Sequence, residues 1–340
     1  MKAFIVHEAN KYELVDIPMP TIKKDEVLIR VKAAALCHSD LDIMDGLRVH
    51  AIKLPVVLGH EFCGVIEELG CDVVGLEKGC LVACECIVWC GTCRFCLQGE
   101  TSVCENFDEI GTCRNGGFAE FVAVPARIVH PIENLGFDET ANIEAAGNGY
   151  HAAQNTQINE GDSVVVIGPG PIGLYTMQFA AMYNPSKLIM VGTKNNRLNI
   201  AKELGATHVI NIHEQDAHDE IMRLTEGKGV DRVIQCAPTA NALKLGLKIL
   251  GKGAIMAIEG HVGQPVPVNF GMFLETPVKA IVGVCGVTHQ NYIDTIALAE
   301  AGKVNFSDII THKFDLVDIL EAIDLMRNKE AGAIKIVINP

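Results

Sequence analysis

The hydrophobic pattern of the first 147 residues consists of short apolar runs that glycine, proline and charged residues interrupt. Runs of this length, bounded by turn-forming residues, are typical of β-strands. The clearest of them span residues 26–36, 63–70, 79–88 and 116–125. This part of the chain is therefore predicted to be β-rich.

The pattern changes near residue 160, where apolar runs begin to alternate with helical stretches. The run Ser163–Gly168 is short and continuous, as in a strand that is buried on both faces. A helical stretch from Pro171 to Tyr183 follows it. The pattern then predicts strands at 187–192, 207–211, 231–237 and 253–260, and helices at 195–205, 218–227 and 240–251. Because strands and helices that alternate at this spacing form βαβ units, we expect an α/β fold with a doubly wound parallel sheet.

Beyond residue 290 the pattern predicts two more helices and a final strand. The helical stretches cover residues 292–303 and 316–330, and the strand covers 333–340. A chain of 340 residues is long enough for two domains, and 49% hydrophobic residues suffice for a sizeable core.

Charge and cysteine content exclude several classes of protein. The net charge of −14 argues against general nucleic-acid binding, which needs a basic face. No apolar run approaches about 20 residues, so we expect no transmembrane helix and no membrane partner. The N-terminus carries charges among its apolar residues and does not look like a signal peptide. The odd number of cysteines, 13, favours reduced thiols and a cytoplasmic location.

Four of these cysteines form a dense group, with three at every third position and a fourth after a gap of seven residues. They are Cys90, Cys93, Cys96 and Cys104. Cys-x₂-Cys hooks deliver thiolates to a tetrahedral Zn²⁺ at about 2.3 Å. The alternatives are an iron–sulfur cluster, whose bacterial spacing closes differently, and unrelated thiols. We interpret the group as a zinc site.

A glycine-rich turn follows the first buried strand. Its sequence is Gly168-Pro169-Gly170-Pro171-Ile172-Gly173, which matches the GxGxxG pattern between a strand and a helix that binds a dinucleotide pyrophosphate. The helix N-terminus that follows offers free N–H groups and a positive dipole end. The alternative is a glycine-rich turn without a ligand.

The end of the next strand bears on the choice between the two nicotinamide cofactors. A carboxylate there would bind the ribose 2′-hydroxyl of NAD, but no Asp or Glu lies between Gly173 and Glu203. The strand ends instead in Gly192-Thr193-Lys194, with Arg197 one helical turn on. Both cations can pair with a 2′-phosphate, so we predict NADP(H). The alternative is that Lys194 and Arg197 are solvated charges at a helix start.

Two upstream segments hold further metal-ligand residues. One is Cys37-His38-Ser39-Asp40, and the other is Gly59-His60-Glu61. Cysteine, histidine and a carboxylate with one open position make a catalytic zinc site. At such a site zinc acts as a Lewis acid on an alkoxide or carbonyl oxygen while a hydride moves to or from the nicotinamide.

With these motifs the chain resembles the zinc-dependent medium-chain dehydrogenases over its whole length, and in particular the sorbitol, threonine and secondary-alcohol dehydrogenase branch. The resemblance rests on CHSD at 37–40, GHEFCGVI at 59–66, the four cysteines, GGFAEFV at 116–122 and GPGPIG at 168–173. It implies a GroES-like catalytic domain formed by residues 1–147 and 290–340, with a structural zinc lobe at about 84–110. It also implies a Rossmann cofactor domain at 148–289, and a homodimer or homotetramer.

The resemblance also implies roles for individual residues. Cys37, His60 and Glu144 would bind the catalytic zinc, and Glu61 would be an exchanging or outer ligand. Asp40 would orient His60, Ser39 would bond the reacting oxygen and pass on its proton, and Lys335 would touch the cofactor pyrophosphate. The four-cysteine zinc would be structural. These roles add up to two zinc ions per chain.

Two positions depart from the family pattern. Asp42 stands where several relatives have a histidine in the proton relay, so the proton would leave through Asp42, through water, or by way of His38 or His50. Asn148 stands where many relatives have threonine beside the nicotinamide.

The resulting expectation is an NADP(H)-linked enzyme that interconverts a secondary alcohol or polyol with its ketone. Two alternatives stay open: an NAD-linked threonine or amino-alcohol dehydrogenase, and a zinc-free NADPH-binding protein with a structural role. A regulatory zinc-finger protein is disfavoured by the acidic charge and by the complete dinucleotide-binding pattern.

Overall fold

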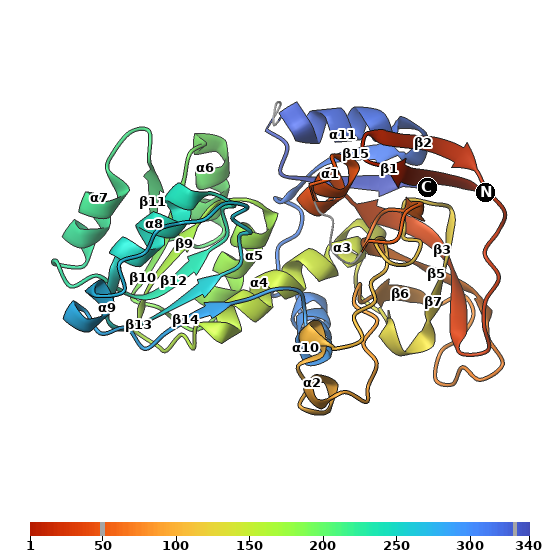
Figure 1. The fold of residues 1–340 in the computed structure, drawn as a ribbon, viewed down its shortest axis with the longest axis horizontal. Helices are drawn as coiled ribbons and strands as arrows, with labels where there is room; N and C mark the ends of the chain where they lie inside the picture. The colour runs from red at the N-terminus through yellow and green to blue at the C-terminus, as the bar shows by residue number, and fades with distance from the viewer. Residues whose placement is uncertain (48–51, 329–331) are drawn as a thin grey trace. The chain divides into compact units, whose positions relative to one another are not determined.

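A computed structural model describes residues 1–47, 52–328 and 332–340. They divide into two compact units, Met1–Glu144 with Val287–Pro340, and Ala145–Gly286. We describe each unit by itself (Figure 1). The domain boundaries given above, at 147/148 and 289/290, stay predictions.

The first unit is built on a seven-stranded sheet whose central strand is β3 (Glu26–Ala35). This strand pairs antiparallel with β5, β7 and β16, so it is hydrogen-bonded along both edges. The sheet order is β15-β16-β3-β5-β6-β8, with β7 also on β3. The remaining strands are β5 (Glu61–Leu69), β6 (Leu81–Cys84), β7 (Phe121–Pro125), β8 (Val129–Pro131), β15 (Ile310–Asp315) and β16 (Lys335–Asn339).

A smaller sheet and several short helices complete the first unit. The sheet has the order β2-β1-β4, with β1 at Lys2–Glu8, β2 at Lys11–Asp16 and β4 at Val56–Val57. The helices are α1 (His38–Met44), α2 (Arg94–Leu97), α3 (Phe137–Ala141), α10 (His289–Glu300) and α11 (Ile319–Asn328). The core lies against the β3 sheet, where Phe4, Phe62 and Phe118 are fully buried.

The second unit is a six-stranded parallel sheet with the order β11-β10-β9-β12-β13-β14. The strand order reverses between β9 and β12, which in doubly wound folds marks the ligand-binding edge. The strands are β9 (Ser163–Ile167), β10 (Lys187–Gly192), β11 (His208–Asn211), β12 (Val230–Gln235), β13 (Leu250–Ile258) and β14 (Ala280–Gly283). The predicted α/β class with a parallel sheet is confirmed.

The helices of this unit lie between successive strands. They are α5 (Pro171–Ala181), α6 (Asn195–Glu203), α7 (Ala217–Leu224), α8 (Ala240–Lys248) and α9 (Met272–Glu275), and α4 (Ile143–Asn155) leads in from the first unit. The described part of the chain has no helix long and apolar enough to cross a bilayer.

The structure differs from the sequence-based predictions at several elements. Residues 85–88 were predicted as strand, but β6 ends at Cys84 because the chain there enters the four-cysteine lobe. Residues 250–251 were predicted as helix, but β13 begins at Leu250 because Leu250 pairs with Val230. The strands β14 and β15 were not predicted at all.

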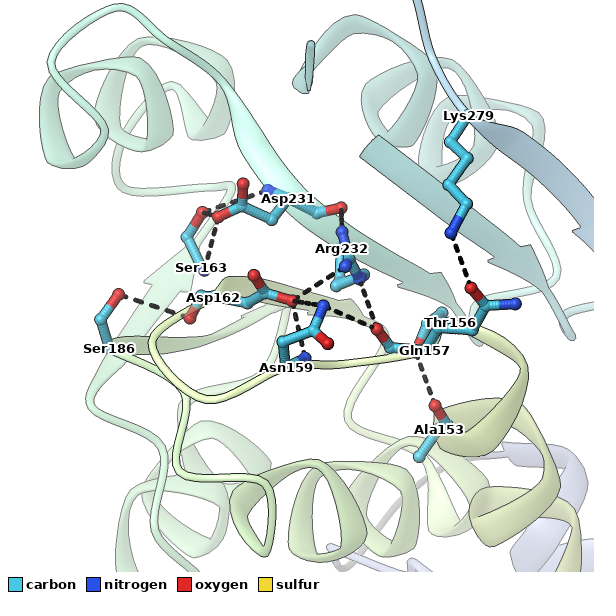
Figure 2. Close-up of polar contacts among 10 residues, drawn as sticks. All are labelled: Ala153, Thr156, Gln157, Asn159, Asp162, Ser163, Ser186, Asp231, Arg232 and Lys279. Carbon is cyan, nitrogen blue, oxygen red and sulfur yellow. Dashed lines mark hydrogen bonds and ion pairs between the residues drawn. The ribbon is translucent and has the colours of Figure 1, made fainter. Parts of the chain in front are cut away.

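A buried polar network fastens β9 to β12 in the second unit (Figure 2). Arg232 on β12 is 8% exposed, pairs with Asp162 at 3.1 Å and donates Nε–H to the Gln157 carbonyl at 3.1 Å. The neighbouring Asp231 accepts from the amide and the hydroxyl of Ser163, at 2.8 and 2.6 Å. The network ties the loop before β9 to the start of β12, away from the glycine-rich turn that follows β9.

Candidate functional site

The four cysteines of the lobe converge on one point. The sulfur atoms of Cys90, Cys93, Cys96 and Cys104 all lie within 4.8 Å of one another. Two pairs, Cys90–Cys96 and Cys93–Cys104, are each 4.0 Å apart. Four sulfurs around one tetrahedral zinc are separated by about 3.8 Å, since each Zn–S bond is about 2.3 Å. The space therefore suits a single ion and is too small for a cluster of several irons.

The local backbone explains how the lobe presents its thiols. Gly91 and Gly99 have positive φ angles of 76° and 87°, which lets the chain reverse at both places. The sulfur of Cys90 accepts amide hydrogens from Thr92 and Cys93 at 3.5 and 3.4 Å. Hydrogen bonds from Asn106 and Thr92 lower the pKa of Cys90 to about 5, so this thiol is prepared for the thiolate form that binds metal.

A second group of ligand atoms lies where β3 and β5 meet. Strand β5 begins at Glu61, which pairs with Ala35 near the end of β3, and Cys37 follows β3 as the N-cap of α1. Ligand atoms of Cys37, His60 and Glu61 lie within 4.8 Å of one another. His60 and Glu61 are 6% and 2% exposed. Cys37 lies just after β3 and His60 just before β5, so the pairing of these two strands brings the predicted cysteine and histidine together.

Asp40 holds this second group in place. It is fully buried, its Oδ2 accepts the Cys37 amide hydrogen at 2.9 Å, and its Oδ1 lies 3.5 Å from Nδ1 of His60. Burial alone would lower the pKa of His60, but Cys37 and Asp40 outweigh it and the pKa is raised. The group therefore carries enough negative charge to attract a cation, and Nε2 of His60 is the nitrogen on the side away from Asp40.

Lys335 and Glu144 extend the charged cluster. The ammonium of Lys335 pairs with Glu61 and donates to the Leu36 carbonyl at 3.1 Å, and the residue is 3% exposed. Burial raises the pKa of Glu61. The nearby Glu144 carboxylate also raises this pKa, whereas the Lys335 ammonium lowers it. Glu144 lies in the first turn of α4, and its Oε1 accepts from the Cys86 thiol at 3.4 Å. It lies close enough to act on Glu61 but is not one of the three ligand-distance residues.

Ser39 and its helix neighbours stand beside the cluster. The Ser39 hydroxyl oxygen is shielded from solvent and has no hydrogen-bond partner within the described ranges. One turn along α1, Nε2 of His38 lies 3.8 Å from Oδ1 of Asp42, and these two side chains are 55% and 34% exposed. Ser39 is therefore available to a ligand, and the His38–Asp42 pair reaches solvent. His50, another candidate relay residue, is outside the described residues.

The glycine-rich turn fits a bound pyrophosphate. Gly168 has φ +110°, and a Cβ there would collide with Ala237; a Cβ at Gly173 would overlap the Gly168 carbonyl oxygen. Gly170 caps α5 ahead of Pro171, and a Cβ on it would meet open space. Gly168 and Gly173 thus allow close backbone packing, while Gly170 leaves room for a ligand at the N-terminus of α5. Ile172 and Gly173 lie in the first turn of this helix.

The end of β10 shows one feature that the sequence analysis missed. Gly192 abuts the ring of Pro169, Thr193 and Lys194 are exposed, and Arg197 is half-buried on α6. The carboxylate of Glu214 also lies near the end of β10. It accepts hydrogen bonds from the side-chain amides of Asn195 and Asn211, at 2.7 and 3.1 Å. Glu214 follows the next strand, so a search limited to the stretch after the fingerprint cannot find it.

Comparisons with known proteins agree with this geometry. Residues 23–134 match the family described as Alcohol dehydrogenase GroES-like domain, and residues 171–301 match Zinc-binding dehydrogenase. The chain is 30% identical to a sorbitol dehydrogenase of Bacillus subtilis, over 100% of this chain and 97% of the relative. It is 33% identical to an L-threonine 3-dehydrogenase of Bacillus velezensis, over 100% and 99%.

A solved structure from Sinorhizobium meliloti, a zinc-binding dehydrogenase with NADP bound, superposes with a TM-score of 0.93. It is 27% identical in sequence, and the match covers 100% of this chain and 99% of the other. The predicted GroES-like region and the predicted parallel-sheet cofactor region are therefore both confirmed as fold assignments.

Proposed function

Because the chain belongs to the zinc-type medium-chain dehydrogenases, and is therefore an oxidoreductase, we propose that it interconverts a secondary alcohol or polyol with its ketone, using zinc and NADP(H). The observation that carries the proposal is the buried group of Cys37, His60 and Glu61 beside the shielded Ser39 hydroxyl. Such a group fits a catalytic zinc site, which keeps one position for substrate.

The residues divide the work of the reaction. Cys37 and His60 hold the metal, and Glu61 or Glu144 supplies the acidic ligand. When bound, zinc acts as a Lewis acid on the substrate oxygen, and the nicotinamide takes or gives the hydride. Asp40 fixes the orientation and tautomer of His60 through Nδ1. Ser39 would accept the alcohol proton at Oγ while it passes on its own hydroxyl proton, and the His38–Asp42 pair of the same helix would carry a proton toward solvent.

Lys335 has a role at this site besides the one predicted for it. The contact of its ammonium with Glu61 opposes the rise in the pKa of that carboxyl that burial causes, since a buried carboxylate needs a paired cation. We propose that Lys335 determines whether Glu61 is held off the metal or released to it. Contact between Lys335 and the pyrophosphate stays a prediction.

The four-cysteine group is proposed as a second, structural zinc site, because four thiolates leave no position for substrate. Gly168, Gly170, Pro171, Ile172 and Gly173 are proposed to hold the pyrophosphate, and Gly192, Thr193, Lys194 and Arg197 to receive the 2′-phosphate of NADP(H).

An NAD-linked threonine or amino-alcohol dehydrogenase is the second candidate. It is favoured by Glu214, whose carboxylate lies beside Asn195 at the start of α6. A carboxylate near the ribose would accept a hydrogen bond from the 2′-hydroxyl of NAD and repel a 2′-phosphate. Lys194 and Arg197 act in the opposite direction.

Homo-oligomerisation is proposed from the edge of the parallel sheet. Strand β14 is an edge strand with the sequence AIVG, and Ile281 on it is 37% exposed; nearby, Phe270 and Leu274 are 74% and 85% exposed. An uncovered apolar edge promotes aggregation, so soluble proteins pair or cover such edges. A cytoplasmic location is proposed because the 13 cysteines form no disulfide bond.

A substrate screen tests the proposed function. Secondary alcohols, polyols and amino alcohols are offered with NADP⁺ and with NAD⁺, to the wild type, to His60→Ala and to the exposed control His213→Ala. We expect turnover of a secondary alcohol or polyol, a loss of about 1,000-fold or more in His60→Ala, since Lewis-acid stabilisation contributes several kcal/mol, and near-native rates in the control. Near-native kcat in His60→Ala would remove the metal site from the mechanism.

A further inference from the structure

Three residues that neither zinc site uses meet in the first unit. Glu85 follows β6, His130 is the middle residue of β8, and His289 is the first residue of α10. Nε2 of His130 and Nδ1 of His289 lie 2.8 and 2.7 Å from the same oxygen, Oε1 of Glu85. One ligand atom of each residue lies within 4.8 Å of the others. Three separate segments of chain thus converge on one point.

Each of the three residues, Glu85, His130 and His289, has a further contact that fixes its side chain or its backbone. The indole N–H of Trp89 donates to the second carboxylate oxygen of Glu85 at 3.2 Å. The ring of His130 packs against Tyr292, with 5.3 Å between ring centroids, and the Tyr292 hydroxyl donates to the Cys84 carbonyl at 2.7 Å. The amide of His289 donates to the Thr101 hydroxyl at 2.7 Å. Outer partners of this kind orient the ligands of metal sites.

The chemistry of the three residues selects a class of ion. Two imidazoles and one carboxylate suit zinc and its neighbours among the divalent transition metals, and do not suit Mg²⁺ or Ca²⁺, which prefer oxygen. Ligands bonded to one zinc at about 2.0 Å are separated by about 3.3 Å, so the present contacts need to open by about half an ångström. Each neutral ring then keeps its proton on the nitrogen that faces away from the ion.

The exposure of the three side chains also suits an ion. The side chain of Glu85 is 3% exposed, that of His130 14% and that of His289 34%, so the carboxylate is buried while one ligand opens to solvent. Three protein ligands leave a fourth position for water. The N-terminus of α10 places a partial positive charge near His289, which makes the binding of a cation weaker.

We propose that Glu85, His130 and His289 form a third metal site, which binds Zn²⁺ or a similar divalent transition-metal ion more weakly than the four-cysteine site. Glu85, Trp89 and Thr101 lie on or beside the four-cysteine lobe, whereas His130 lies on β8 and His289 on α10. An ion at this site therefore fastens the lobe to the rest of the first unit. It provides a way for metal concentration to change the stability of the lobe without touching Cys37 or His60.

The chain carries its own reporter for this site. Trp89 is the only tryptophan in the sequence, its indole N–H bonds to Glu85, and its ring lies 5.1 Å from the ring of His289. A paramagnetic ion bound by Glu85 and His289 is close enough to quench the fluorescence of this indole. Binding can therefore be measured without any turnover, so that failure of this proposal and failure of the proposed function are distinguishable.

The test is a Ni²⁺ titration of the enzyme that holds zinc at the other two sites, followed by Trp89 fluorescence and by equilibrium dialysis, which gives the bound metal in the presence of free Ni²⁺. We expect saturable quenching, one nickel per chain at saturation, unchanged zinc content, and relief of quenching by excess Zn²⁺. His289→Gln should weaken nickel binding about tenfold or more, because even loss of an outer partner costs 10- to 100-fold. The matched control is His218→Gln, since His218 lies between two aspartates in the exposed group Asp216–His218–Asp219.

Three results would overturn the proposal. The first is no saturable quenching in the wild type, which would leave the three residues as a hydrogen-bonded network only. The second is equal quenching in the wild type and in His289→Gln. The third is quenching with an equal loss of zinc, which would mean that nickel had replaced zinc in the lobe. The wild-type competition by Zn²⁺ keeps the test decisive if the variant does not fold.

Discussion

At the proposed catalytic zinc site, contacts with neighbouring residues explain the positions of single side chains. Asp40 connects the Cys37 amide to the His60 ring, and Lys335 neutralises Glu61. Cys37, His60 and the glycines could be predicted from the sequence, because each of them lies in a short motif. The pairing of Lys335 with Glu61 could not be predicted, since the two residues are far apart in the chain and meet only through the packing of β16 on β3 and of β3 on β5.

The cofactor preference is decided by a few charged residues at the end of β10. Replacing both Lys194 and Arg197 by alanine should raise KM for NADPH about tenfold or more and leave KM for NADH nearly unchanged. The physical reason is that a charge-assisted bond to phosphate contributes about 1.5–3 kcal/mol. Lys202→Ala, on an exposed position of the same helix, is the control. A lower KM for NADH than for NADPH in the wild type would contradict the NADP(H) proposal and favour a role for Glu214.

At the scale of whole elements, the buried parallel strands were predicted well, whereas two edge strands, β14 and β15, were not predicted. Strand β9 is continuous in apolar residues and buried throughout, so its sequence alone identifies it. Strand β14 has only four residues and β15 alternates half-buried with exposed positions, so pairing with a neighbour defines each of them. Helix α4 contains two glycines, and glycine disfavours a helix. One of them, Gly149, is needed because a side chain there would collide with α5.

The third metal group was missed for a related reason. Its contacts join residues that are 45 and 204 positions apart, and no short motif links them. Only the arrangement of β6, β8 and α10 brings them together.

The four-cysteine lobe should depend on its ion for its structure. Within residues 84–110 the helices are short, and a metal that binds only the folded lobe adds its binding energy to folding. Cys93→Ser should therefore lose one zinc per chain and lower Tm by roughly 10 °C or more. Cys71→Ser, at an exposed cysteine, should change neither quantity. An unchanged Tm in Cys93→Ser would show that the lobe does not need the ion.

The network at the start of β9 and β12 should stabilise the second unit (Figure 2). Arg232→Met leaves the Asp162 carboxylate without its buried partner and removes the bond to Gln157. Breaking such a pair costs about 3–5 kcal/mol, which urea denaturation can measure. Arg223→Met is the control, because the ion pair of Arg223 with Glu220 lies on the surface and its side chain is 68% exposed. Equal unfolding midpoints for the two variants would contradict a structural role for the network.

At the scale of the whole molecule, we propose that the two zinc sites have different roles. The four thiolates of Cys90, Cys93, Cys96 and Cys104 would stabilise a lobe, and the group around Cys37 and His60 would carry the chemistry. The acidic charge of −14 argues against general nucleic-acid binding and places no constraint on the proposed neutral substrate.

The most direct test is the zinc content per chain of the purified wild type and of His60→Ala, measured after dialysis against metal-free buffer. Two zinc ions are predicted in the wild type and one in His60→Ala. The weaker third site loses its ion during dialysis, and losing the histidine empties the catalytic site but leaves the four thiolates intact. One zinc in the wild type, or the same content in both proteins, would contradict the claim that His60 holds a catalytic metal.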